Sequence, residues 1–178
     1  MKNIVLIGFM GTGKTVVSKI LAPRLKRQRL CIDDMIEWKV GKPIPRIFAE
    51  DGEPYFRKIE SEMVAVVSKD RNVVIDAGGG VVMDEHNIKR LREHGVLFCL
   101  TARGDIILER TRKYMRVRPL LNTENPLKKI EDLLKERQEY YKRTDHTIDT
   151  SDITSDEVAD KIIETMEGEE TDLPPHQL

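Results

Sequence analysis

The sequence has few features typical of secreted, membrane or disulfide-stabilised proteins. It has only two cysteines, Cys31 and Cys99, and each lies in an apolar run rather than at the paired spacing of metal ligands. The apolar run before Gly8 is only four residues long, which is too short for a signal peptide or a membrane span. We therefore expect a cytoplasmic protein with two buried, reduced thiols and no membrane partner.

An excess of charge of either sign is also missing. The chain of 178 residues has 30 basic and 31 acidic side chains, so its formal net charge is -1. A balanced chain exerts no long-range attraction on nucleic acid or anionic lipid. Repeats with a period of 20 to 50 residues are absent too, which argues against a solenoid or a propeller. We expect no nucleic-acid partner. We also expect a monomer.

Short apolar runs alternate with longer amphipathic stretches along the chain. Several runs are continuously apolar, as strands covered on both faces must be, and this alternation predicts an α/β fold with a five-stranded parallel sheet flanked by helices. The predicted strands are 4–7, 30–32, 73–75, 96–100 and 146–148. The predicted helices are 14–26, 34–40, 55–69, 85–94, 105–113, 126–143 and 156–166. We expect one domain over residues 1–166 and a disordered, acidic, proline-containing tail over 167–178.

A glycine-rich segment joins the first predicted strand to the first predicted helix. Residues 8–15 read GFMGTGKT and match the phosphate-binding pattern G-x-x-x-x-G-K-[ST], in the strand-to-helix context that the pattern requires. Backbone N–H groups of such a loop and the helix N-terminus bind phosphate, Lys14 would reach the β- and γ-phosphates, and Thr15 would ligate Mg²⁺. The cofactors expected are ATP and Mg²⁺, and the expected nucleotide-binding residues here are Gly11, Thr12, Gly13, Lys14, Thr15 and Val16.

Further segments resemble those of the shikimate kinase family. They are the phosphate loop, 32–37, 48–53, Phe56 with Arg57, 78–80, 118–121, and Arg137 followed by Tyr141, in the family's order over about residues 2 to 165. The resemblance implies a P-loop kinase with a substrate-binding segment at about 33–60 and a lid at about 112–123. It implies transfer of the γ-phosphate of ATP to the 3-hydroxyl of shikimate, giving shikimate 3-phosphate and ADP, in the synthesis of aromatic amino acids through chorismate.

The resemblance also implies roles for acceptor-site residues, and their chemistry agrees with those roles. Arg57 and Arg137 match the arginines that bind the carboxylate of shikimate, and a guanidinium is suited to bidentate contact with a carboxylate. Asp33 matches the aspartate that holds the reactive hydroxyl and would serve as its base. Gly78, Gly79 and Gly80 would let the backbone approach the ligand without a Cβ clash.

Two more sets of residues match the nucleotide side of the family. Arg118, in the lid, would stabilise charge on the transferring phosphoryl group, so the catalytic residues implied are Lys14, Asp33 and Arg118. Arg110 and Thr150 match positions that contact adenine. The alternative for the cluster of basic residues around the lid is a nucleic-acid patch, which the near absence of interleaved aromatic residues and the balanced charge disfavour.

The sequence departs from the family at Cys31. The family has an aspartate of the magnesium site at this position, and a neutral thiol is a poor partner for a hard cation. Asp76 ends a predicted strand, where many P-loop proteins have an aspartate that orients Mg²⁺. We expect Thr15 and Asp76 to form the metal site, the alternative being that Asp76 caps the following turn. Two other functions stay open, a different small-molecule P-loop kinase for nucleoside monophosphates or gluconate, and a catalytically silent nucleotide-binding module.

Overall fold

The computed structural model describes residues 1–112 and 123–171. Its strands are β1 (Asn3–Ile7), β2 (Gln28–Cys31), β3 (Val73–Asp76), β4 (Gly95–Thr101) and β5 (His146–Asp149). Its helices are α1 (Lys14–Arg24), α2 (Ile32–Val40), α3 (Ile44–Glu50), α4 (Gly52–Val67), the 3₁₀ turn η1 (Val81–Met83), α5 (Glu85–His94), α6 (Gly104–Thr111), α7 (Pro126–Tyr141) and α8 (Ser155–Thr171). Within these ranges, every helix is too short or too polar to span a bilayer.

The five strands form one parallel sheet in the order β2-β3-β1-β4-β5. The predicted fold class is therefore confirmed. Because all strands run in the same direction, their carboxyl ends meet at one edge, and the order reverses at β1, between β3 and β4. The segments that follow β1, β2 and β3 thus begin close together in space.

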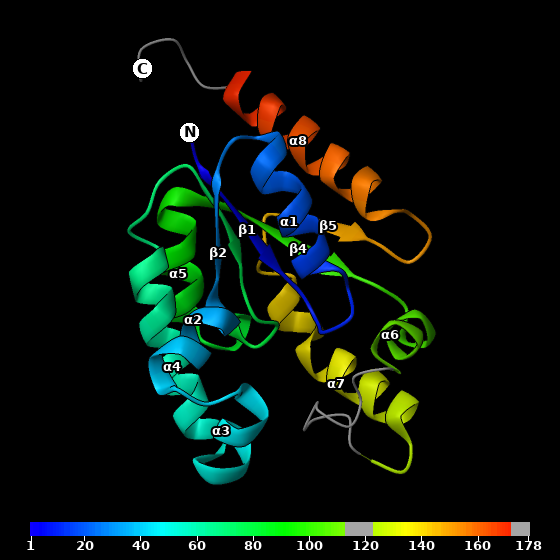
Figure 1. Cartoon of the computed structure of the whole chain (residues 1–178). Helices are drawn as coiled ribbons and strands as arrows, with labels where there is room; N and C mark the ends of the chain where they lie inside the picture. Colours follow the sequence, from blue (N-terminus) through cyan, green and yellow to red (C-terminus); the bar gives the residue numbers. More distant parts are fainter. Residues whose placement is uncertain (113–122, 172–178) are drawn as a thin grey trace.

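Alternate residues of the strands enter two separate cores. Val5 and Ile7 of β1 face the core beneath α4 and α5, whereas Ile4 and Leu6 face the core beneath α1 and α8. Figure 1 shows these two helix pairs on opposite sides of the sheet. A third cluster, which includes Phe9, Ile107 and Ile130, lies where α6 and α7 pack together. Coverage on both faces explains why the strands are continuously apolar in sequence.

Several local expectations need correction. No helix was predicted between Val40 and Tyr55, yet α3 occupies part of this stretch, with Pro45 in its first turn, where a missing N–H costs no hydrogen bond. The expected buried thiol of Cys31 is only half-buried, because β2 lies at the edge of the sheet, whereas Cys99 is buried. The predicted lid falls mainly on residues 113–122, outside the described residues.

The predicted tail began too early, because α8 continues to Thr171. Its extension has a tertiary cause at Glu169. One carboxylate oxygen contacts His146 Nε2 at 2.9 Å and the other contacts Lys2 Nζ at 3.2 Å. These contacts connect the last turns of α8 to the segment before β1 and to β5. Residues 172–178 lie outside the described residues.

Removing the Glu169 carboxylate will destabilise the fold modestly. Each partly exposed ion pair is worth about 0.2 to 1 kcal/mol, so Glu169→Ala should lower the free energy of unfolding by about 0.5 to 1.5 kcal/mol. Urea titration followed by circular dichroism measures this change. Glu164→Ala, at an exposed position on the same helix, is the matched control. Equal stability of the two variants would contradict the role given to Glu169.

Candidate functional site

The turn between β1 and α1 has the close backbone packing that its glycines predict. Gly8 has a φ of 143°, and a Cβ atom there would lie 2.1 Å from the carbonyl oxygen of Leu100 on β4, so no other residue fits without a shift. Gly13 precedes α1, and its carbonyl accepts hydrogen bonds from the N–H groups of Val16 and Val17. The N-terminus of α1 therefore opens on the loop, as anion binding requires.

Two side chains of the loop donate hydrogen bonds to carbonyl oxygens of the loop itself. Lys14 Nζ donates to the carbonyl oxygens of Gly8 at 2.8 Å and Phe9 at 3.0 Å. Thr12 is fully buried, and its hydroxyl donates to Phe9 O at 2.7 Å, so this side chain supports the loop rather than facing solvent. Thr15 and Val16 are exposed at the mouth of the loop.

A hollow of about 630 Å³ lies against this loop. It brings together most of the residues expected on the nucleotide and metal side, from distant parts of the chain. The lining residues include Gly11, Thr12, Gly13, Lys14, Thr15, Val16, Asp33, Asp76, Arg110 and Thr150. Arg118, expected in the lid, lies outside the described residues.

Arg110 and Thr150 contact each other and the loop. Arg110 donates from Nη1 to Thr150 Oγ1 at 2.9 Å and from Nη2 to Thr150 O at 2.7 Å. The buried Thr150 hydroxyl also lies 3.0 Å from the carbonyl oxygens of Thr12 and Thr101. These contacts tie α6, the end of β5 and the phosphate loop into one wall of the hollow.

Asp33 lies in the first turn of α2, which begins directly after β2. Asp33 is accessible to solvent at the mouth of the hollow. The protein packed around it still limits hydration of the carboxylate and so raises its pKa, whereas the nearby charge of Lys14 acts in the opposite direction. Asp76, Asp34 and Glu37 add further upward shifts. A carboxylate with a raised pKa, beside the lysine of a phosphate loop, is suited to accept a proton from a hydroxyl group.

Asp76 lies at the carboxyl end of β3, directly opposite Cys31 in the register with β2. It is 4% exposed, and its Oδ2 atom accepts hydrogen bonds from Arg29 Nη2 at 2.8 Å and Ser18 Oγ at 3.2 Å. Burial raises the pKa of the Cys31 thiol to about 12, so the position that faces Asp76 is uncharged at neutral pH. The carboxylate at this edge of the hollow therefore comes from β3 and not from β2.

The oxygen donors beside the loop fit only certain cations. Among the described residues, there is no group of three or more histidine, cysteine, aspartate or glutamate side chains that could hold a metal ion. The Thr15 hydroxyl and the Asp76 carboxylate both line the hollow. One hydroxyl and one carboxylate suit a cation that takes its other ligands from phosphate and water, as Mg²⁺ does.

Arg57 of α4 is held by two glutamates of the same helix. Its Nη1 contacts Glu60 Oε2 at 2.8 Å, and its Nε and Nη2 contact Glu53 Oε1 at 3.2 and 2.9 Å. The guanidinium also packs against the backbone at Gly80, where a Cβ atom would lie 2.0 Å from Nη1. The position of Arg57 thus depends on the short segment after β3.

Glu60 is a site residue that our reading of the sequence missed. It is 2% exposed, and its Oε1 is buried without a hydrogen-bond partner in the described part of the chain. Burial raises its pKa, while Arg57 acts in the opposite direction, and Asp33 and Arg137 also lie within electrostatic reach. The spacing of Glu53, Arg57 and Glu60 on one helix face was the available signal.

Arg137 of α7 lies near the same backbone segment. It is 6% exposed, its guanidinium lies 5.6 Å from the centre of the Phe9 ring, and its Nε is buried without a partner among the described residues. Tyr141, one turn later, donates to Gly79 O at 3.2 Å, and a Cβ atom on Gly79 would lie 2.5 Å from Gly8 O. The structure therefore brings the expected acceptor residues Asp33, Arg57, Gly78, Gly79, Gly80 and Arg137 to the edge beside the phosphate loop.

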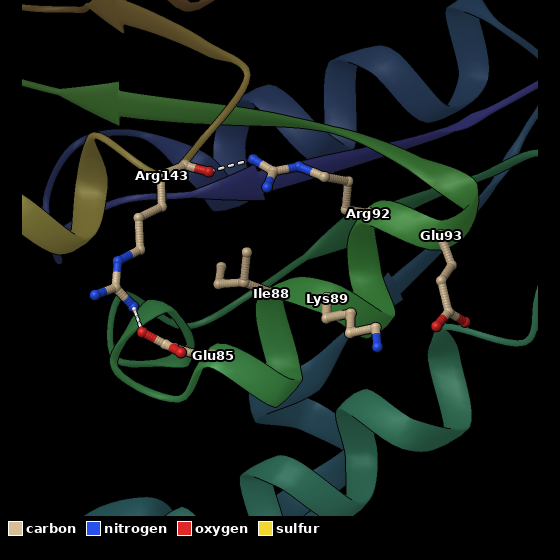
Figure 2. A pocket seen from close by; sticks show the side chains of 6 residues that line it. All are labelled: Glu85, Ile88, Lys89, Arg92, Glu93 and Arg143. Atoms are coloured by element: carbon tan, nitrogen blue, oxygen red, sulfur yellow. Dashed lines mark hydrogen bonds and ion pairs between the residues drawn. The ribbon is translucent and has the colours of Figure 1, made fainter.

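A second hollow, of about 540 Å³, lies beside α5 and away from the phosphate loop. Figure 2 shows its lining, in which both arginines already have partners. Arg143 pairs with Glu85 at 2.9 Å, and Arg92 pairs with Asp145 at 3.0 Å. None of the residues expected in the functional site lines this hollow.

Comparisons with known proteins agree with this arrangement. The sequence profile described as shikimate kinase matches residues 10–167. A shikimate kinase of Thermodesulfovibrio yellowstonii is 47% identical over 94% of this chain and 96% of its own length. A shikimate kinase of Caldanaerobacter subterraneus is 47% identical over 92% of this chain and 95% of its own length.

Solved structures extend the likeness. A shikimate kinase of Acinetobacter baumannii, in complex with shikimate, superposes with a TM-score of 0.90 at 35% identity, over 95% of this chain and 94% of its own. A deoxyadenosine kinase of M. mycoides with bound dATP superposes with a TM-score of 0.63 at 13% identity, over 94% of this chain and 100% of its own. At this identity the similarity concerns the fold alone. On the match of the profile and of near full-length relatives, this chain belongs to the shikimate kinase family.

Proposed function

We propose that this chain transfers the γ-phosphate of ATP to the 3-hydroxyl of shikimate, in chorismate and aromatic amino-acid biosynthesis. The observation that carries the proposal is the group of Asp33, Arg57 and Arg137 around Glu60, at the strand edge that also holds the phosphate loop. Shikimate has one carboxylate and three hydroxyls, and this group offers two guanidinium groups and a carboxylate. We further propose that the enzyme is a cytoplasmic monomer whose partners are its small-molecule substrates.

On the nucleotide side, the backbone N–H groups of residues 11–16 bind the phosphates of ATP. Lys14, which now donates to the Gly8 and Phe9 carbonyls, turns toward the β- and γ-phosphates. Arg110 and Thr150 fix the wall beside the adenine. Arg118, which lies outside the described residues, would stabilise the negative charge that spreads over the oxygens of the transferring phosphoryl group. Mg²⁺, which Thr15 and Asp76 would hold, neutralises phosphate charge when bound.

On the acceptor side, Arg57 and Arg137 orient shikimate through its carboxylate. Glu60 fixes one end of the Arg57 guanidinium, whereas Glu53, with a side chain 44% exposed, occupies the Nε and Nη2 edge and is easily displaced by a ligand carboxylate. The buried Nε of Arg137, which has no hydrogen-bond partner among the described residues, favours binding of an acceptor at this place. Asp33 receives the proton of the 3-hydroxyl as the new O–P bond forms.

Shikimate will be the preferred acceptor. We expect shikimate-dependent ADP release, measured in a coupled assay with ATP and Mg²⁺, to exceed that with quinate, gluconate or nucleoside monophosphates. Nucleoside monophosphates lack the carboxylate, and quinate and gluconate arrange their hydroxyls differently about it. Lys14→Met is the control for contaminating kinases. Equal or faster turnover with a nucleotide acceptor would refute the assignment.

Loss of either arginine will impair use of shikimate. Truncating one partner of a buried charge pair costs about 2 to 5 kcal/mol, so Arg137→Ala should lower kcat/KM for shikimate by about 30-fold or more. Arg137→Lys should restore little, because a point charge cannot replace a planar fork. Arg90→Ala, at an exposed position on α5, is the control. A change of less than about threefold in Arg137→Ala, which is under about 0.7 kcal/mol, would contradict the contact.

Asp76 will set the magnesium requirement. We expect Asp76→Asn to raise the Mg²⁺ concentration for half-maximal rate, because an amide is a weaker ligand for a hard cation than a carboxylate. Adding Cys31→Asp to Asp76→Asn should bring this Mg²⁺ concentration part of the way back to that of the parent enzyme, since residue 31 faces residue 76 across the two strands. An unchanged magnesium titration in Asp76→Asn would show that Asp76 serves only as the buried partner of Arg29 and Ser18.

A further inference from the structure

Arg29 is a partly buried cation that the proposed reaction has not used. It lies on the edge strand β2, two residues before Cys31, with a side chain 19% exposed. Its Nη2 donates to Asp76 Oδ2 at 2.8 Å and its Nε donates to Ser18 Oγ at 2.8 Å. The same guanidinium therefore contacts β3 and α1, the helix that follows the phosphate loop.

The three residues form a closed set of contacts behind the hollow. Ser18 is fully buried, and its hydroxyl lies 3.2 Å from Asp76 Oδ2 and 3.1 Å from Thr15 O. Both contacts that the structure describes for the Asp76 side chain go to Oδ2. Oδ1 is thus the carboxylate oxygen left for a ligand in the hollow, and the orientation of the carboxylate is fixed from two other elements.

The positive charge of Arg29 does not prevent Asp76 from binding a cation. Its Nη1 also lies 3.6 Å from Asp34 Oδ2, so two carboxylates share the positive charge of one guanidinium. Without Arg29, the 4% exposed Asp76 would lose its ion-pair partner, and removing one partner of a buried ion pair is strongly destabilising.

We propose that Arg29, together with Ser18, is a positioning residue for the nucleotide side of the site, and that it presents Asp76 Oδ1 to the metal ion. The inference rests on the metal role of Asp76 in the proposed function. The proposed unit joins residues of β2, β3 and α1, at a point of the sheet where Cys31, opposite Asp76, supplies no carboxylate.

The test is direct binding of Mn²⁺ to the enzyme with ADP, followed by the electron paramagnetic resonance signal of free Mn²⁺. Arg29→Met, which removes the guanidinium and retains much of the side-chain length, should weaken Mn²⁺ binding about tenfold, as does loss of a residue that orients a metal ligand. Arg29→Lys should lie between this variant and the parent, because it makes one contact instead of two. Shikimate affinity, followed by fluorescence of the single tryptophan Trp38, should be unchanged in Arg29→Met.

A double variant separates positioning from a merely structural ion pair. Arg29→Met with Asp76→Asn has no unbalanced buried charge, so its urea midpoint should lie closer to the parent than that of Arg29→Met alone. Under the proposal its Mn²⁺ affinity nevertheless stays low. Recovery of Mn²⁺ affinity together with stability would overturn the proposal.

Two further outcomes are distinguishable. If Asp76→Asn weakens Mn²⁺ binding while Arg29→Met binds it as tightly as the parent or more tightly, the role of Arg29 is refuted and that of Asp76 stands. If Asp76→Asn leaves Mn²⁺ binding unchanged, the metal role of Asp76 fails and the role of Arg29 fails with it. Turnover of shikimate by the parent enzyme remains a separate measurement in both cases.

Discussion

The site depends on the contact of three backbone segments at Gly8. A Cβ atom on Gly8 would meet Leu100 O at the end of β4, and a Cβ atom on Gly79 would meet Gly8 O. The start of the phosphate loop therefore lies between the segment after β3 and the end of β4, without side chains between them. This packing places the N–H groups of the loop next to the segment against which Arg57 lies, and so brings the residues of the proposed nucleotide and acceptor sites together.

Around this contact, charged side chains are buried in matched groups. Glu60 balances Arg57, and Asp76 balances Arg29, each pair with an N–O distance of 2.8 Å. Burial of one charge alone is costly, and the partner that balances it also fixes its orientation. The same interactions thus keep the charges in the fold and fix the orientation of each side chain in the pair.

The sequence predicted the strands, most helices and the phosphate loop because each has a local signal. The capping box of Thr154 and Glu157 is present, with Glu157 N donating to Thr154 Oγ1 at 3.2 Å, and Asn125 caps α7 through a contact to Lys128 N. The end of α8 was predicted too early because Glu169 is held by residues distant in sequence. The partnership of Arg29 with Asp76 could not be predicted either, because it depends on the order of strands in the sheet and not on spacing along the chain.

The contacts of Glu169 bring the last turns of α8 close to the segment before β1, which bears on how the chain could be reconnected. Lys2 and Glu169 are 167 positions apart in sequence, yet their charged atoms lie 3.2 Å apart. A short peptide joining residues near these two positions would therefore span little distance, and new ends could be opened in an exposed loop elsewhere. The turn around Lys69 to Asn72, between α4 and β3, is such a loop, on the side of the sheet opposite to the ligand edge. A circularly permuted chain opened there would keep the described residues of the site in their present three-dimensional relation.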